Sequence, residues 1–154
     1  MSRIQLALNV DDVEAATAFY ATLFGTQPAK TRPGYANFAI ADPPLKLVLL
    51  ENPGQGGSLN HLGIEVQSVD EVDAAQTRLA EHGLASIDER GTTCCYAKQD
   101  KFWVEGAPGG ERWEVYTVLA DSPTFAEATA DGQTCCGSPV TDRTGAAATP
   151  ASCC

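Results

Sequence analysis

The amino-acid sequence repeats one pattern of secondary structure, and this repeat constrains the fold more than any other feature. Residues 4–10 (IQLALNV) alternate apolar with other side chains as a strand does, and residues 61–66 (HLGIEV) do so again. The two segments are offset by 56 residues, the separation of Gln5 from His61. Each predicted strand precedes a predicted helix and several β-like segments. The pattern predicts an α+β fold in which two βαβββ modules form a curved mixed sheet around a cleft.

Both predicted helices carry start and stop signals. An Asp-Asp pair at residues 11–12 caps the first helix, and Gly25 ends it. In the second helix Ser68 and Glu71 form a capping box, and Gly83 marks the end. The helices therefore occupy equivalent places in the two modules.

The composition divides the chain into modules, a linker and a tail. Residues 1–52 are the first predicted module, residues 53–58 (PGQGGS) a linker, and residues 59–120 the second module. The β-like segments are expected at residues 35–41, 45–50, 84–89, 93–96, 101–105 and 111–119. Residues 121–154 are rich in small and polar side chains, so a disordered, cysteine-containing tail of low complexity is predicted there.

The net charge excludes several partners. A formal charge of −10 argues against nucleic acid and against an anionic membrane surface. No segment approaches the roughly 20 apolar residues that a membrane span needs. The N-terminal MSRIQLALNV is too short in apolar residues for a signal sequence. A soluble cytoplasmic protein with reduced thiols is expected, and a homodimer is left open.

Strand alternation brings three candidate metal ligands to one face. Gln5 and His61 lie opposite the apolar side chains of their strands, and Glu114 lies opposite Val115 in the last strand. An imidazole, a carboxylate and an amide oxygen suit a divalent transition metal. The alternatives are a hydrogen-bonded structural role for His61 and pairing of Glu114 with Arg112. The equivalent positions of Gln5 and His61 in the repeat favour the metal site.

The cysteines stand in adjacent pairs rather than scattered along the chain. There are six, at Cys94, Cys95, Cys135, Cys136, Cys153 and Cys154. Neighbouring cysteines bridge to each other only with strain, so the pairs resemble dithiol ligands for a soft ion. The pair at 94–95 is the one within the predicted folded part, and we expect it at a strand end or loop. The two tail pairs have no clear role in the fold.

Several segments between residues 3 and 119 resemble the vicinal oxygen chelate superfamily, which includes glyoxalase I, extradiol dioxygenases and fosfomycin-resistance proteins. They are the strand IQLALNV, the segment NHLGIEV, and the closing FWVEGAPGGERWEVY. In that superfamily the metal ligands lie on the first and last strands of the modules. The resemblance places them at Gln5, Val48, His61 and Glu114. Val48 departs from the pattern, which leaves three ligands and an open face.

The segment TTCCYA at residues 92–97 narrows the resemblance. It is similar to the organoarsenical C–As lyases, a group that includes proteins described as cadmium-induced. The resemblance implies a non-haem Fe(II) enzyme of dioxygenase type that cleaves the carbon–arsenic bond of trivalent methyl- or aryl-arsenicals. Fe(II) and O₂ would be its cofactor and co-substrate, with Ni, Co or Mn as substitutes, and inorganic As(III) its product. Beyond the metal ligands it implies no catalytic side chain.

The resemblance also implies a substrate site. Its residues would be Cys94, Cys95, Tyr96, Lys101, Phe102 and Trp103, with accessory As(III) binding by Cys135, Cys136, Cys153 and Cys154. Cys94 and Cys95 would hold the arsenic, and Lys98 or Lys101 is a candidate to favour their thiolates. Residues 97–110 are interpreted as a cover over this site, or as a plain hairpin loop with Trp103 in the core.

Two other functions remain open. A sequestration protein for cadmium or arsenic would use the thiols, but it leaves the set Gln5, His61 and Glu114 without a purpose. Another enzyme of the superfamily, such as an extradiol dioxygenase, would leave the pair at 94–95 incidental.

Overall fold

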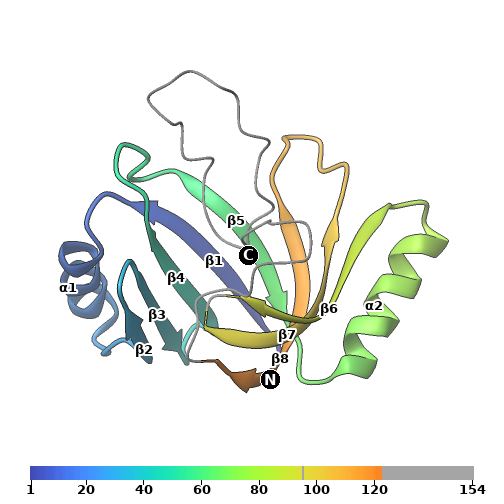
Figure 1. The fold of residues 1–154 in the computed structure, drawn as a ribbon, viewed down its shortest axis with the longest axis horizontal. Helices are drawn as coiled ribbons and strands as arrows, with labels where there is room; N and C mark the ends of the chain where they lie inside the picture. The colour runs from blue at the N-terminus through green and yellow to red at the C-terminus, as the bar shows by residue number, and fades with distance from the viewer. Residues whose placement is uncertain (95, 123–154) are drawn as a thin grey trace.

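The chain folds as two consecutive βαβββ modules (Figure 1). The computed structural model describes residues 1–94 and 96–122. The first module comprises β1 (Arg3–Val10), α1 (Val13–Phe24), β2 (Lys30–Arg32), β3 (Tyr35–Ile40) and β4 (Leu45–Glu51). The second comprises β5 (Leu59–Glu65), α2 (Val69–Glu81), β6 (Ser86–Cys94), β7 (Ala97–Val104) and β8 (Trp113–Asp121). The predicted α+β class and module repeat are confirmed.

The two modules share one curved mixed sheet. Its strand order is β2-β3-β4-β1-β5-β8-β7-β6 in the described part of the chain, so the order in one module mirrors that in the other. β1 runs parallel to β4, and β5 runs parallel to β8. β1 and β5 pair antiparallel, and this pair is the seam between the modules. The helices lie at opposite ends of the sheet in Figure 1.

The helix caps follow the predicted signals. The Asp12 side chain accepts a hydrogen bond of 2.8 Å from Ala15 N, and Gly25 ends α1 in the left-handed conformation with φ of 61°. The Ser68 hydroxyl accepts from Glu71 N at 3.2 Å. These contacts satisfy backbone groups that have no partner within the helix.

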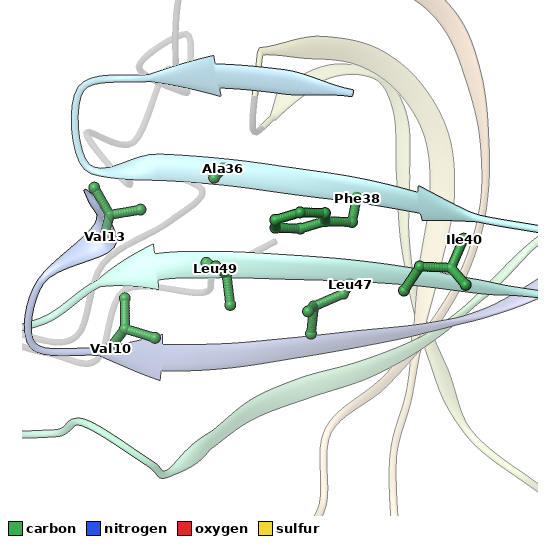
Figure 2. Close-up of a cluster of buried hydrophobic side chains, with 7 residues drawn as sticks. All are labelled: Val10, Val13, Ala36, Phe38, Ile40, Leu47 and Leu49. Atoms are coloured by element: carbon green, nitrogen blue, oxygen red, sulfur yellow. The ribbon is translucent and has the colours of Figure 1, made fainter. Parts of the chain in front are cut away.

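Apolar side chains on one face of the sheet pack against the helices. In the first module this cluster comprises Val10, Val13, Ala36, Phe38, Ile40, Leu47 and Leu49, drawn from β1, β3, β4 and the start of α1 (Figure 2). In the second module Val72 of α2 packs against Phe102 and Val115. Burying this face against the helices leaves the opposite face of the sheet to form the cleft.

The strands of the second module are longer than predicted. The segments expected at 84–89 and 93–96 are one strand, β6, and the segment expected at 101–105 belongs to β7, which begins at Ala97. β7 pairs with both β6 and β8. The interpretation of residues 97–110 as a cover or loop is therefore wrong for residues 97–104. β2 was not among the predicted segments.

Several predictions fall outside the described residues. These concern Cys95, the tail pairs Cys135, Cys136, Cys153 and Cys154, and the disordered state of the tail from residue 123 onward. Within residues 1–94 and 96–122, neither helix is long and apolar enough to cross a membrane.

Candidate functional site

Three strands place Gln5, Gly63 and Glu114 side by side in one row. Gln5 on β1 pairs with Gly63 on β5, and Gly63 pairs with Glu114 on β8. A methyl group at Gly63 would lie 3.2 Å from Gln5 Cβ and 3.3 Å from Glu114 Cγ. Because glycine leaves this space empty, the two side chains meet over it. Gln5 Nε2 donates a hydrogen bond of 2.8 Å to Glu114 Oε1.

His61 completes the predicted set of ligands. It precedes Gly63 by two residues on β5, so both residues share a face. His61 Nε2 lies 2.9 Å from Gln5 Nε2 and 3.4 Å from Glu114 Oε1. The side chains of Gln5, His61 and Glu114 are all buried. The structure thus brings together the three residues that strand alternation selects.

A chain of asparagines fixes the tautomer of His61. Asn9 Nδ2 donates to Ser58 Oγ, and Asn60 Nδ2 donates to Asn9 Oδ1, both at 2.9 Å. Asn60 Oδ1 therefore faces His61 Nδ1 at 2.7 Å as an acceptor. The proton of His61 then lies on Nδ1, and the lone pair of Nε2 faces Gln5 and Glu114. This is the tautomer that a metal-binding imidazole needs.

Lys101 supplies a buried positive charge beside this set. Its Nζ lies 3.1 Å from Glu114 Oε2, 3.4 Å from Glu89 Oε2 and 3.7 Å from Cys94 Sγ, and its side chain is fully buried. Burial alone would raise the pKa of the Glu114 carboxyl. The positive charge of Lys101 is the largest effect that opposes burial, and it lowers that pKa to about 2. Glu114 is therefore ionised.

Tyr116 contacts the far side of the Gln5 amide. Its hydroxyl lies 2.6 Å from Gln5 Oε1, 2.8 Å from Glu65 Oε2 and 3.0 Å from Lys46 Nζ. Arg3 also binds Glu65 at 3.0 Å. Burial, reinforced by the Glu65 carboxylate, raises the pKa of Tyr116 well above its usual value, so the hydroxyl keeps its proton.

A cavity of about 220 Å³ opens beside the three candidate ligands. Its apolar wall includes Tyr35, Val48 and Ala97. Gln99 also lines it and is buried. Its Nε2 donates to Cys94 O at 3.4 Å, while its Oε1 has no hydrogen-bond partner among the described residues. Gln99 is a site residue that the sequence reasoning missed. Alternation along β7, which groups it with Lys101, is the signal that would have identified it.

The residues fit a divalent transition metal. The described residues contain no group of three His, Cys, Asp and Glu side chains placed to hold a metal ion, so a centre here depends on Gln5 as the third ligand. The imidazole, the carboxylate and the amide lie within 3.4 Å of one another. Val48 packs in an apolar cluster with Ala7 and Cys94, so residues 1–94 and 96–122 offer no fourth ligand on that side.

Cys94 ends β6 and lies next to this centre. Its side chain is fully buried, and Tyr96 beyond it has a positive φ of 62° in the turn to β7. The prediction of a strand end is therefore confirmed for Cys94. The sequence predicts reduced thiols, whereas Cys94 is disulfide-bonded in the structure, and every other cysteine lies outside the described residues. Binding of arsenic by Cys94 would require its reduced form.

The other predicted substrate residues lie in different surroundings. Tyr96 is almost buried and packs against Tyr35, with ring centroids 5.4 Å apart. Trp103 meets His61 edge to face at 5.5 Å and lies between Lys101 and Arg112. These two aromatic side chains are on the cleft side of the sheet, Tyr96 near Cys94 and Trp103 near the candidate metal centre.

Phe102 is a correction to the predicted substrate site. Its side chain is fully buried in the cluster with Val72 and Val115, under α2. Because side chains alternate along a strand, Phe102 faces away from the cleft while Lys101 and Trp103 face toward it. The prediction that Phe102 lines the substrate site is wrong.

Comparison with known proteins agrees with this geometry. The sequence pattern of the Glyoxalase/Bleomycin resistance protein/Dioxygenase superfamily matches residues 3–115. The chain is a member of that superfamily. Its fold resembles that of an extradiol ring-cleaving dioxygenase from Brevibacterium fuscum, with a TM-score of 0.55 and 20% identity over 77% of this chain and 33% of that one.

Two relatives within the superfamily are much more similar in sequence. The cadmium-induced protein CadI of Mycobacterium tuberculosis is 66% identical over 88% of this chain and 93% of its own length. A trivalent organoarsenical cleaving enzyme of Thermomonospora curvata is 56% identical over the full length of both. The resemblance to the C–As lyase and cadmium-induced group is thereby confirmed, and the named relatives support an enzyme of this superfamily.

Proposed function

We propose that the chain cleaves the carbon–arsenic bond of trivalent methyl- or aryl-arsenicals in a reaction that depends on Fe(II) and O₂ and releases inorganic As(III). One observation carries the proposal. The ammonium group of Lys101 contacts both Glu114, a candidate metal ligand, and Cys94, a candidate arsenic ligand. A soft-ion site and a transition-metal site therefore meet at one buried side chain. The organoarsenical cleaving relative of T. curvata supports the same chemistry.

Gln5, His61 and Glu114 are the residues that would hold the metal. His61 offers Nε2 and Glu114 offers Oε1, while Lys101 keeps the second carboxylate oxygen in place. Bound Fe(II) would supply the activation of O₂; Ni, Co or Mn are candidate substitutes. The side without a protein ligand, next to Val48, is open to the cavity.

The cysteine pair at 94–95 would anchor the substrate. An arsenical R–As(OH)₂ exchanges both hydroxyl groups for the sulfurs of two thiols, whose protons leave with the hydroxyl groups as two molecules of water, while the carbon group stays on arsenic. In the reduced protein, the positive charge of Lys101 would lie beside the Cys94 sulfur that binds arsenic. The apolar wall of Tyr35, Val48 and Ala97 gives the organic group a place beside the metal ligands.

An anaerobic assay tests the proposal. The reduced protein is loaded with Fe(II), mixed with methylarsenite or a trivalent phenylarsenical, and exposed to air, and the arsenic species are then separated and quantified. Inorganic As(III) is expected only when both Fe(II) and air are present. An argon arm and a metal-free arm serve as controls. Absence of As(III) in the complete mixture would remove the proposed activity.

Sequestration of soft ions is the second candidate, because one relative is named as cadmium-induced. That function would use thiols and would not need the buried set of Gln5, His61 and Glu114. It predicts stoichiometric uptake of Cd²⁺ or As(III) without release of a cleaved organic group. A catechol arm in the same assay separates the extradiol alternative, for which ring cleavage would be detected by absorbance.

Replacing Gly63 by alanine is expected to weaken metal binding by at least about tenfold. The added methyl group would meet Gln5 and Glu114 at 3.2–3.3 Å and push the two ligands apart. Metal affinity is measured by competition with a fluorescent chelator. Ala120→Val, at an exposed position of β8, is the matched control and should bind metal like the parent. Unchanged affinity in Gly63→Ala would show that the ligands do not converge over this residue.

A further inference from the structure

The hydroxyl of Tyr116 has more acceptors than it can serve. Tyr116 is fully buried and follows Glu114 by two residues on β8, so both side chains face the cleft. Two oxygens approach its hydroxyl, Gln5 Oε1 at 2.6 Å and Glu65 Oε2 at 2.8 Å. A tyrosine hydroxyl has a single proton. Only one of these contacts can therefore be a hydrogen bond donated by Tyr116.

The nitrogen of the Gln5 amide, rather than its oxygen, faces the candidate metal centre. Gln5 Nε2 lies 2.8 Å from Glu114 Oε1 and 2.9 Å from His61 Nε2. An amide nitrogen is a donor and does not offer a lone pair to a metal. In this orientation Gln5 occupies the centre with an N–H group, which suits the metal-free protein.

Turning the amide by half a revolution resolves both contacts. Gln5 Oε1 would then face His61 and Glu114, and Gln5 Nε2 would donate to the Tyr116 oxygen. The Tyr116 hydroxyl would then donate its hydrogen bond to Glu65 alone. The Tyr116 oxygen would accept from Lys46 Nζ as well, which lies 3.0 Å away and also pairs with Glu65 at 3.1 Å. The Tyr116 hydroxyl would then serve a single acceptor.

The turned orientation needs a cation. Three atoms with lone pairs, from Gln5, His61 and Glu114, would converge with no proton between them, and such a buried group is unfavourable without a positive ion. The amide orientation is therefore coupled to occupation of the centre.

We propose that Tyr116 is a positioning residue, which, together with Glu65 and Lys46, lets the Gln5 amide present its nitrogen in the metal-free protein and its oxygen when a divalent metal is bound. The inference rests on the proposed metal centre. It goes further by assigning the selection of the third ligand atom to a tyrosine that does not itself bind the metal.

Tyr116→Phe tests the inference, because phenylalanine keeps the ring and removes the hydroxyl. The affinity for Fe(II), measured anaerobically by chelator competition, is expected to fall about 10–100-fold. Tyr20→Phe on α1 is the matched control and should bind like the parent. Glu65→Gln removes the strong acceptor at a partly exposed position, so it should weaken binding in the same direction even if Tyr116→Phe folds poorly.

A second background separates positioning from a general structural effect. In Gln5→His, the ligand is an imidazole and no amide has to turn, so adding Tyr116→Phe should change metal affinity less than threefold. Equal losses in the two backgrounds, or an unchanged affinity in both Tyr116→Phe and Glu65→Gln, would overturn the inference. Failure of the parent protein to bind Fe(II) at all would instead remove the proposed metal centre.

Discussion

Lys101→Met is expected to lower the free energy of unfolding by about 3–5 kcal/mol, the usual cost of removing one partner of a buried ion pair. The substitution keeps most of the side-chain volume and leaves Glu114 ionised without its counter-charge. Glu89 loses a partner as well. Urea unfolding under reducing conditions, with chelator present, measures the change. Lys98→Met, exposed on the same strand, should lie within about 0.5 kcal/mol of the parent.

The pH dependence gives this prediction a second readout. The pKa of Glu114 is about 2 in the folded protein against an ordinary value of 4.5, so the ionised carboxylate contributes stability above pH 4.5 and loses it as the pH falls toward 2. Much of this contribution depends on Lys101. The stability difference between parent and Lys101→Met should therefore narrow as the pH falls from 5 to 3. A difference below about 1 kcal/mol at neutral pH would contradict the role of the ion pair.

His61→Ala and Cys94→Ser are both expected to abolish arsenical cleavage, but through opposite losses. His61→Ala removes a ligand itself, so the metal affinity should fall by more than the roughly 100-fold that is typical when a hydrogen-bond partner of a ligand is removed. This variant should still bind the arsenical. Cys94→Ser should keep the metal and lose the arsenical, because one of two thiolates is gone. Metal binding is measured by chelator competition, and arsenical binding by equilibrium dialysis under argon with arsenic quantified by mass spectrometry.

His82→Ala provides the control for the histidine substitution. His82 is the other histidine of the sequence. It caps the C-terminal end of α2 and is not one of the candidate ligands Gln5, His61 and Glu114. This variant should bind metal and arsenical like the parent. The contrary outcome is that His61→Ala and Cys94→Ser take up soft ions equally and do not differ from each other in metal affinity or arsenical binding. Sequestration by thiols would then be the better explanation.

Periodicity predicted much of the candidate centre because the ligands lie on regular strands. Alternation alone placed Gln5, His61 and Glu114 on one face, and the structure brings these side chains within hydrogen-bonding distance. Alternation along β5 and β8 also puts Glu65 and Tyr116 on that face, whereas the contact of Tyr116 with Gln5 depends on the register of β1, β5 and β8. The importance of Gly63 was visible only as a glycine within a strand.

Periodicity failed where polar side chains are buried. The sequence KQDK at residues 98–101 has the polarity of an exposed loop, yet these residues lie in β7. Lys101 can be buried because Glu89 and Glu114 compensate its charge. Both partners lie on other strand segments, so the pattern of residues around Lys101 does not predict these ion pairs. A β-like segment was expected at residues 101–105, but Phe102 was still assigned to the substrate site together with Trp103. Along β7 the two side chains alternate, so Phe102 faces the opposite side of the sheet.

The row of Gln5, Gly63 and Glu114 crosses the seam between the two modules, so an ion bound there would link them. Gln5 comes from the first module, whereas His61 and Glu114 come from the second, and β1 and β5 join them. An ion held by all three would act as a clasp that fastens one half of the molecule to the other. Loss of the ion would then loosen the union of the two halves, and with it the cavity that both halves enclose.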